Sequence, residues 1–313
     1  MKVFCHIPRE NWFCDRFGKE YQEYSTLNVS HEDLDCDLIW LLASWCWNQI
    51  PYEILKSNRV VCTIHHEVPW KFDENRLNNF MARDEIVDAY HVPCNQTKEF
   101  ISKITSKPIY KIGYWCNNHL WKRCENRDAI KTEFGLPLDR LVVSSFQRDT
   151  EGNDLITPKL EKGPDLFCDV VETLNKRRKI HVLLNGWRRQ YIISELEKRK
   201  IPFTYHELPE INDVVRMYSA TDLYIVTSRV EGGPQSLLEC SATRTPIVST
   251  DMGMARDVLS SGCIIDDLSG IEDTVDKSYM LTEENYSNVI KFFIENHVKE
   301  YDNLFRRIVE KSV

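Results

Sequence analysis

The sequence has no long hydrophobic run, no closely spaced cysteine pair and no excess of positive charge. Its longest apolar stretch, LIWLLASWCW at 38–47, is far shorter than the roughly 20 residues of a membrane-spanning helix. The eleven cysteines contain no Cys-x-x-Cys, which argues against zinc and redox motifs. Forty basic against 48 acidic residues give a net charge of −8, which argues against nucleic acid as a partner. With no signal peptide at MKVFCHIPRENW, we expect a cytoplasmic protein with reduced thiols.

Several common nucleotide and nucleophile motifs are also missing. No Gly-x-Gly-x-x-Gly follows the first predicted strand, and no P-loop or Gly-x-Ser-x-Gly occurs, so dinucleotide, P-loop and hydrolase chemistry are disfavoured. An Asp-x-Asp motif is present at Asp35-Cys36-Asp37, but it precedes a predicted strand. A metal that holds a diphosphate belongs at the carboxyl end of a strand, so we expect no metal here.

The remaining pattern predicts an α/β protein. A chain of 313 residues is long enough for two domains, and short apolar runs alternate with helical patterns throughout. This alternation predicts two doubly wound parallel sheets that face each other. Strands are expected in the first half at 2–7, 37–42, 60–64, 89–92 and 109–112. Strands are expected in the second half at 141–145, 181–184, 203–205, 223–227, 247–250 and 263–265.

Three segments follow from this pattern. Residues 1–122 are expected to form the first domain and 123–285 the second, since a polar helical piece ends in Gly-Leu-Pro just before the strand at 141–145. Residues 286–313 carry apolar side chains three or four apart, from Tyr286 to Ile308. This stripe predicts one long helix that packs back toward the first domain.

The most informative stretch is TSRVEGGPQSLLECSATRTPIVSTDMG at 227–253. A strand ends at Thr227, and a loop with two adjacent glycines leads through Pro234 into a helix. Such a loop lets the backbone approach a ligand, and the helix N-terminus attracts an anion. Glu239 lies further along the helix, where it could reach a ribose joined to a bound phosphate. The residues expected to bind this ligand are Gly232, Gly233, Pro234, Gln235, Ser236 and Glu239.

The segment SRVEGGPQSLLECSATRTPIVSTDMGMARDVLSSG resembles the donor-binding segment of the family-four retaining glycosyltransferases, which have the two-domain GT-B fold. The family signature is a pair of glutamates separated by seven residues, here Glu231 and Glu239. The resemblance covers 136–262 well and the first half of the chain weakly. It implies that Glu239 binds the nucleotide ribose and that Glu231, with the backbone of the glycine loop, holds the donor sugar and phosphates.

The resemblance also implies a catalytic basic pair and a histidine. Arg148 and Lys162 match the pair that neutralises the departing diphosphate, although Lys159 could replace Lys162. In VVCTIHHEVP, His65 fits the family's histidine near the transferred sugar better than His66 does, and His66 remains an acceptor-side candidate. The family's glycine-rich loop after the first strand is absent. Two arginines could supply positive charge on that acceptor side, Arg9 and Arg16.

The resulting hypothesis is a retaining glycosyltransferase that acts without a metal or cofactor in glycan biosynthesis. The donor is expected to be a UDP- or GDP-linked sugar, and the acceptor a glycan or a lipid-linked glycan. Such an acceptor leaves open a peripheral contact with the inner membrane surface. Two alternatives stay open: a sugar-nucleotide epimerase on a similar fold, and a catalytically silent subunit that binds a sugar nucleotide.

Overall fold

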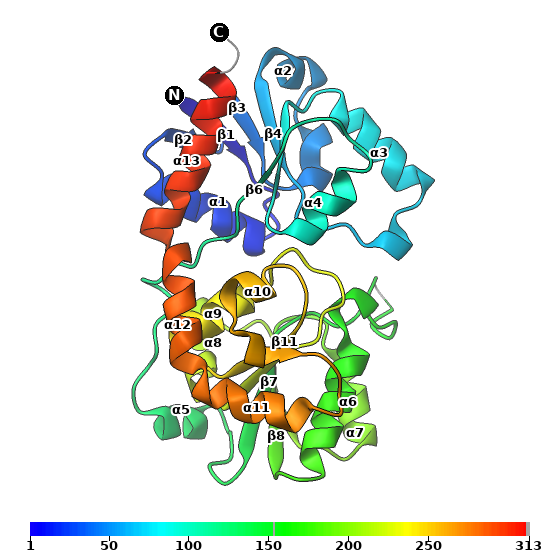
Figure 1. Cartoon of the computed structure of the whole chain (residues 1–313), viewed down its shortest axis with the longest axis vertical. Helices are drawn as coiled ribbons and strands as arrows, with labels where there is room; N and C mark the ends of the chain where they lie inside the picture. Colours follow the sequence, from blue (N-terminus) through cyan, green and yellow to red (C-terminus); the bar gives the residue numbers. More distant parts are fainter. Residues whose placement is uncertain (153, 311–313) are drawn as a thin grey trace. The chain divides into compact units, whose positions relative to one another are not determined.

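The chain consists of two units, each built on one parallel sheet. The computed structural model describes residues 1–152 and 154–310. Unit 1 comprises Met1–Asn117 together with Lys291–Val313, and unit 2 comprises Asn118–Ile290. Each unit contains a six-stranded sheet flanked by helices, as Figure 1 shows. The predicted pair of Rossmann-like domains is therefore confirmed.

The sheet of unit 1 has the strand order β2-β1-β3-β4-β5-β6, and every pair of neighbours is parallel. Its strands are β1 (Lys2–His6), β2 (Asn28–Ser30), β3 (Leu38–Leu41), β4 (Arg59–Thr63), β5 (Ala89–Val92) and β6 (Ile109–Lys111). Its connecting helices are α1 (Phe13–Tyr24), η1 (Ser44–Gln49), α2 (Tyr52–Ser57), η2 (Pro69–Lys71), α3 (Glu74–Asp84) and α4 (Asn95–Ile101). All four residues of β3 and of β5 are buried, as in a parallel sheet covered on both faces.

The sheet of unit 2 has the order β12-β11-β10-β7-β8-β9 and is also parallel. Its strands are β7 (Leu141–Ser145), β8 (Ile180–Asn185), β9 (Phe203–His206), β10 (Leu223–Val226), β11 (Ile247–Thr250) and β12 (Ile264–Ile265). Its helices up to β10 are α5 (Arg127–Glu133), η3 (Leu160–Lys162), α6 (Pro164–Asn175), α7 (Gln190–Lys198) and α8 (Ile211–Ala220). The later helices are α9 (Gln235–Thr243), α10 (Ala255–Val258), η4 (Ser261–Cys263), α11 (Ile271–Met280) and α12 (Thr282–Val289).

The edge strand β2 was not expected from the sequence. It pairs in parallel with β1 over only three residues, Asn28, Val29 and Ser30, of which Val29 alone is buried. A single apolar residue gives no periodicity to recognise, so a strand this short is indistinguishable from a loop in the sequence.

The single long helix expected from Tyr286 onward is wrong. The structure has α12, then a short 3-10 turn η5 (Ile290–Phe292), then α13 (Ile294–Glu310). Ile290, which belongs to the predicted stripe, is 45% exposed, so the stripe does not continue through the turn. Unit 2 ends at Ile290 and unit 1 resumes at Lys291, within this turn, so α12 and α13 belong to different units.

The helix α13 completes the core of unit 1, where it runs beside α1 and the sheet (Figure 1). Tyr301 and Phe305 from α13 lie 5.6 and 5.2 Å, between ring centroids, from the buried indole of Trp40 in β3. The Phe305 ring also meets Tyr21 of α1 edge-on at 5.7 Å. This aromatic cluster fixes the last helix to unit 1.

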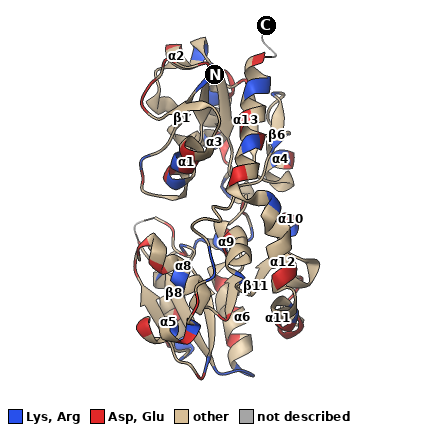
Figure 2. Cartoon of the chain, turned by 90° about the vertical axis from the view of Figure 1, so that its left-hand side faces the viewer, with Lys and Arg blue, Asp and Glu red and all other residues tan. Residues whose placement is uncertain are grey.

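Charges of both signs are interspersed along the surface helices, as Figure 2 shows for α1, α5 and α13. No described helix combines the length and the apolar character that a bilayer crossing requires. Within the described residues no disulfide joins the cysteines.

Candidate functional site

The loop after β10 in unit 2, residues 228–234, is held by two neighbouring loops. The backbone N–H groups of Arg229 and Val230 donate to the carbonyl oxygen of Glu161 at 2.8 and 3.1 Å. On the other side, the hydroxyl of Thr250 donates to the carbonyl oxygen of Ser228 at 2.5 Å. The loop therefore has a fixed course at the carboxyl edge of the sheet, where ligands of such sheets bind.

Two glycines allow these loops to approach each other. Gly163, with φ of +61°, packs so closely on Thr227 that an added Cβ would lie 1.9 Å from the Thr227 carbonyl oxygen. Gly253, with φ of +55°, packs on the glycine loop itself, where a Cβ would lie 2.5 Å from the Gly232 oxygen and 2.7 Å from that of Glu231. Both positions need glycine for backbone conformation and for space. Gly163 had not been identified from the sequence, although its Gly-Pro start of a helix repeats the chemistry of Gly233-Pro234.

Basic side chains gather beside the glycine loop. The Lys162 ammonium forms an ion pair with the Glu231 carboxylate, and both side chains are largely buried. The Nζ atom of Lys159 lies 3.6 Å from Oε1 of Glu161, a neighbour of Lys162 in η3. Burial, together with the positive charges of Lys159 and Arg148, lowers the pKa of Lys162 to about 7. The structure thus brings Arg148, Lys162 and Glu231 together, with Lys159 close by.

Arg148 follows β7 and is positioned by its neighbours. Its Nε donates to the carbonyl oxygen of Thr150 at 2.8 Å, and partial burial lowers the pKa of its guanidinium. The next residue, Asp149, is buried and lies 3.4 Å from Nε of the fully buried Arg189, which follows β8. This ion pair joins the loops after β7 and β8. It was not predicted, because neither residue belongs to a recognisable motif.

The helix α9 carries the rest of the predicted donor-side residues. It begins at Gln235, with Pro234 as its N-cap. The predicted residues before and at its start are Gly232, Gly233, Pro234, Gln235 and Ser236. All lie on the glycine loop or in the first turn of α9, beside the Lys162–Glu231 pair.

Glu239 lies in the second turn of α9 and is only 6% exposed. One of its carboxylate oxygens accepts a hydrogen bond of 2.8 Å from the hydroxyl of Tyr218, which fixes the side chain. Nearby, the amide Nε2 atoms of Gln147 and Gln235 are buried without a hydrogen-bond partner among the described residues. A buried donor without a partner costs roughly 1–3 kcal/mol, so these amides favour a ligand that brings oxygen atoms.

In unit 1, His65 follows β4 and is held on both ring nitrogens. Nε2 lies 2.8 Å from the Leu42 carbonyl oxygen, which can only accept, so Nε2 carries the hydrogen. Nδ1 then accepts from the Tyr114 hydroxyl at 2.5 Å. Burial lowers the pKa of His65 to about 4, so the ring is neutral at pH 7. With both nitrogens bonded and a lowered pKa, this ring is not suited to taking a proton at neutral pH, while His66 beside it is half-buried.

The two arginines predicted for the acceptor side lie at the start of unit 1. Arg9 lies in the loop after β1 and has a left-handed backbone with φ of +57°. The buried carboxylate of Asp15 accepts hydrogen bonds from the N–H groups of Arg9 and Trp12 and so holds this loop. The guanidinium of Arg9 pairs with Glu32 at 2.6 Å. Arg16 lies in the first turn of α1 and is half-buried.

The Asp-x-Asp motif lies at the amino end of β3. Asp35 pairs with the Lys2 ammonium at 2.6 Å, and Asp37 accepts from the Lys2 backbone N–H at 2.7 Å. Among the described residues, no group of three or more His, Cys, Asp or Glu side chains is arranged to hold a metal ion. The two aspartates therefore bind a lysine at the strand entrance.

Residues 158–271 match the family of glycosyl transferases group 1. The O-antigen biosynthesis glycosyltransferase WclY of Escherichia coli is 21% identical over 204 residues, which are 60% of this chain and 53% of that protein. The chain thus spans about half the length of this curated relative. The O-antigen chain mannosyltransferase RfbU of Salmonella typhimurium strain LT2 is 21% identical over 286 residues, which are 85% of this chain and 76% of that protein.

Solved structures share the fold. A sucrose-phosphate synthase from Thermosynechococcus elongatus matches with a TM-score of 0.72 and 18% identity, over 98% of this chain and 81% of that one. HepE of Anabaena, in complex with UDP and glucose, matches with a TM-score of 0.74 and 12% identity, over 97% and 99%. The chain therefore has the GT-B fold of these structures, and its residues 158–271 match the family model of the group 1 glycosyl transferases.

Proposed function

We propose that the chain transfers a glycosyl unit from a nucleotide-diphosphate sugar to a hydroxyl of a glycan or lipid-linked glycan, with retention of the anomeric configuration. The observation that carries the proposal is the contact between Lys162 and Glu231. It places a buried cation against the loop that leads into α9, beside Arg148 and Lys159. A diphosphate bound there would meet positive charge, loop backbone and a helix N-terminus together.

In the proposed reaction, the bond between the anomeric carbon and the diphosphate oxygen breaks. The acceptor oxygen forms a new bond to the same carbon on the same face, and its proton passes to the departing diphosphate. Charge develops on the diphosphate in the transition state, so Arg148 and Lys162 stabilise it where it forms. The Lys162 ammonium would then bind the diphosphate in place of Glu231, and the Glu231 carboxylate would bind the donor sugar.

The ribose end of the donor would lie at Glu239. Its carboxylate is already fixed by Tyr218, so it can receive the hydroxyl hydrogens of the ribose without losing side-chain freedom on binding. The partnerless amides of Gln147 and Gln235 would donate to donor oxygens in the same region. The choice between UDP and GDP is open in this scheme, and the HepE complexes with UDP make uridine donors the first to test.

We also propose that transfer needs no divalent metal. The support is that Lys162, Lys159 and Arg148 already place positive charge where a metal would be needed. The Asp-x-Asp carboxylates, by contrast, bind Lys2 at the amino-terminal edge of the sheet of unit 1.

The test is a transfer assay with a panel of UDP- and GDP-sugars and glycan acceptors, run in excess chelator. We expect release of nucleoside diphosphate that depends on the acceptor, and a product whose anomeric proton coupling shows retention. Activity that is abolished by chelator and restored by manganese would refute the metal-free site. An inverted product would refute retention, and product formation without any acceptor would favour an epimerase.

A further inference from the structure

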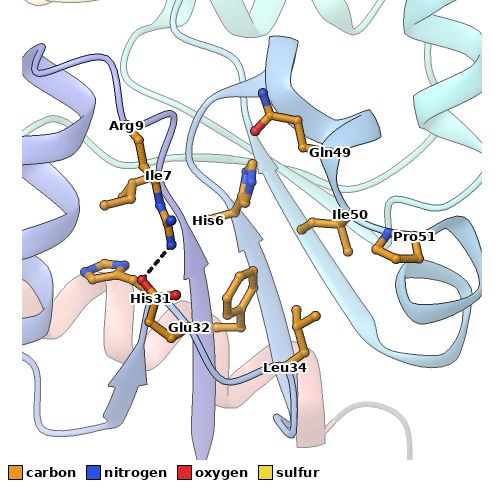
Figure 3. A pocket seen from close by; sticks show the side chains of 10 residues that line it. His6, Ile7, Arg9, His31, Glu32, Leu34, Gln49, Ile50 and Pro51 are labelled. Atoms are coloured by element: carbon orange, nitrogen blue, oxygen red, sulfur yellow. Dashed lines mark hydrogen bonds and ion pairs between the residues drawn. The ribbon is translucent and has the colours of Figure 1, made fainter.

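Unit 1 contains a cavity of about 280 Å³ at the carboxyl ends of its first strands. Figure 3 shows its walls: His6 ends β1, Arg9 follows it, and Glu32 follows β2, while Gln49 ends η1. The volume is slightly below the usual range for sites of drug-sized ligands, which start at roughly 300 Å³, and suits one small ring. Neither the family match at 158–271 nor the donor-side residues of unit 2 extend to this cavity.

The walls of the cavity divide into an apolar and a polar part. The apolar side chains that line it are Phe4, Ile7, Leu34, Ile50 and Pro51. In Figure 3, Ile50 and Pro51 lie on one side of His6, and the Arg9–Glu32 pair lies on the other. A ligand with an apolar face and several polar groups around its edge would complement this arrangement.

The polar wall carries no net charge. The Arg9 guanidinium and the Glu32 carboxylate are 2.6 Å apart, so each neutralises the other. Burial and the charge of Arg9 lower the pKa of His6, which keeps this ring neutral at pH 7. The cavity therefore offers hydrogen-bond donors and acceptors, but no net attraction for an anion.

Two histidine nitrogens at the cavity have no hydrogen-bond partner among the described residues. Nδ1 of His31 lies 2.7 Å from the Cys5 carbonyl oxygen and must donate to it, so Nε2 of His31 is an acceptor. This Nε2 atom and Nδ1 of His6 are both buried and unpartnered. A hydroxyl group can donate to one nitrogen or accept from another, whereas a phosphate dianion only accepts.

We propose that this cavity binds one neutral saccharide unit of the acceptor, packing its C–H face on the apolar wall and its hydroxyls on the histidines, Gln49 and the Arg9–Glu32 pair. The inference rests on the proposed function, because a sugar-nucleotide epimerase or a silent binding subunit would need no acceptor site, whereas glycosyl transfer does. It narrows the acceptor to a neutral sugar end and excludes a phosphorylated one.

The test is histidine-detected NMR on the full chain, with the ring signals of His6 and His31 assigned by substitution. We expect at least one of methyl glucopyranoside, galactopyranoside or mannopyranoside, at millimolar concentration, to shift both signals. The His181 signal, from a ring bonded to Thr204 in unit 2, should not move. Inorganic phosphate should shift neither cavity signal. Absence of any response to the three glycosides, or a response to phosphate, overturns the proposal.

Two variants sharpen the result. Leu34→Trp fills the cavity without removing a polar group and should abolish the glycoside shifts. Glu32→Gln leaves the charge of Arg9 unbalanced and should make phosphate shift the His6 signal, whereas the exposed Glu23→Gln of α1 should not. A Glu32→Gln protein that stays insensitive to phosphate contradicts the charge argument. Glycoside shifts that persist in Leu34→Trp contradict the location.

Titration of the same samples with UDP- and GDP-sugars separates the two proposals. If a donor binds and no glycoside does, the cavity proposal alone fails. If no donor binds and no transfer occurs, the proposed function fails, whatever the histidine signals show. If both proposals are correct, Leu34→Trp should raise the KM for the acceptor at least tenfold and leave the affinity for the donor unchanged.

Discussion

The carboxylate of Asp302 in α13 accepts a hydrogen bond of 2.8 Å from the hydroxyl of Tyr21 in α1, 281 positions earlier in the chain. The same carboxylate accepts from the Ser25 hydroxyl at 2.7 Å and from both the N–H and the hydroxyl of Thr26, at 2.9 and 2.7 Å. Asp302 is buried, and each of its oxygens is used twice. One side chain thus ties α13 to the end of α1.

Replacing Asp302 with Ala should destabilise unit 1 by about 3 kcal/mol, because charge-assisted bonds are lost and buried donors remain without partners. Hydrogen exchange should show faster exchange in β1 and β3, with unit 2 unchanged. The exposed Asn303→Ala, one position further along α13, is the matched control and should have little effect. Faster exchange confined to unit 2 would contradict the role of α13 in unit 1.

Lys162→Ala should lower turnover by roughly a hundredfold or more, because a cation that stabilises the departing diphosphate is lost. Lys159→Ala should cost less than tenfold, since the charge of Lys159 is paired with Glu161. Release of nucleoside diphosphate measures both. Equal losses of turnover in the two variants would show that Lys162 is wrongly assigned as the lysine that binds the diphosphate.

Donor binding should take up a proton above neutral pH. Lys162 has a pKa of about 7 in the free protein, and a bound diphosphate stabilises its charged form and raises that pKa. Below pH 7 the lysine is already charged, so affinity should be level there and should fall as pH rises from 7 toward 9. Calorimetry at pH 8 in HEPES and in Tris should give different heats, and Lys162→Gln should remove the difference. Identical heats for the unaltered protein would rule out this titration.

Gly253→Ala should weaken donor binding more than it weakens folding. The new Cβ would press on the carbonyl oxygens of Gly232 and Glu231 and displace the donor loop. Gly135→Ala is the matched control, because Gly135 also has a positive φ, of +68°, but has open space around its Cβ position. Both variants carry backbone strain of about 1–2 kcal/mol, and only Gly253→Ala should lose donor affinity. Donor titration and thermal unfolding separate the two effects, and equal affinities would argue against the loop's role.

Unit 1 should lose stability as pH falls below 6.5, because it contains two histidines that are neutral at pH 7, the fully buried His91 and the half-buried His65. Burial lowers the pKa of His65 to about 4 and that of His91 to about 3, whereas the unfolded chain protonates both near 6.5. The unfolded state therefore binds more protons in this window, and acid favours unfolding. For His65 alone the loss reaches about 3 kcal/mol by pH 4. In denaturant unfolding from pH 7 to 4.5, His65→Gln should flatten the slope, and an unchanged slope would contradict this account.

The fold could be predicted from the sequence wherever buried strands form continuous apolar runs. The expected strands at 89–92, 141–145 and 247–250 match β5, β7 and β11 residue for residue. The break between α12 and α13 was missed because Tyr286, Ile290 and Phe293 keep helical spacing across the turn, although the chain leaves one helix there. The spacing of apolar residues indicates which side chains share a face, but it does not show whether one helix continues without a break.

The placement of the proposed donor-side residues could be predicted because most of them are close in sequence, in a loop and the helix that follows it. The Asp149–Arg189 pair and the Arg9–Glu32 pair were not, because each joins residues that only the sheet topology brings together. The neutral state of His65 was equally hidden, since it depends on the Leu42 carbonyl and the Tyr114 hydroxyl from other strands and loops.

The division of unit 1 between Met1–Asn117 and Lys291–Val313 sets an order of events during biosynthesis. A ribosome releases all of unit 2 before it delivers α13, so unit 2 can fold on the nascent chain while the rings of Tyr21 and Trp40 still lack Tyr301 and Phe305. Proteins usually fold from the first domain onward as they are made. Here the domain translated first is completed last, and its exposed aromatic surface is the part of the nascent chain that a chaperone would need to cover.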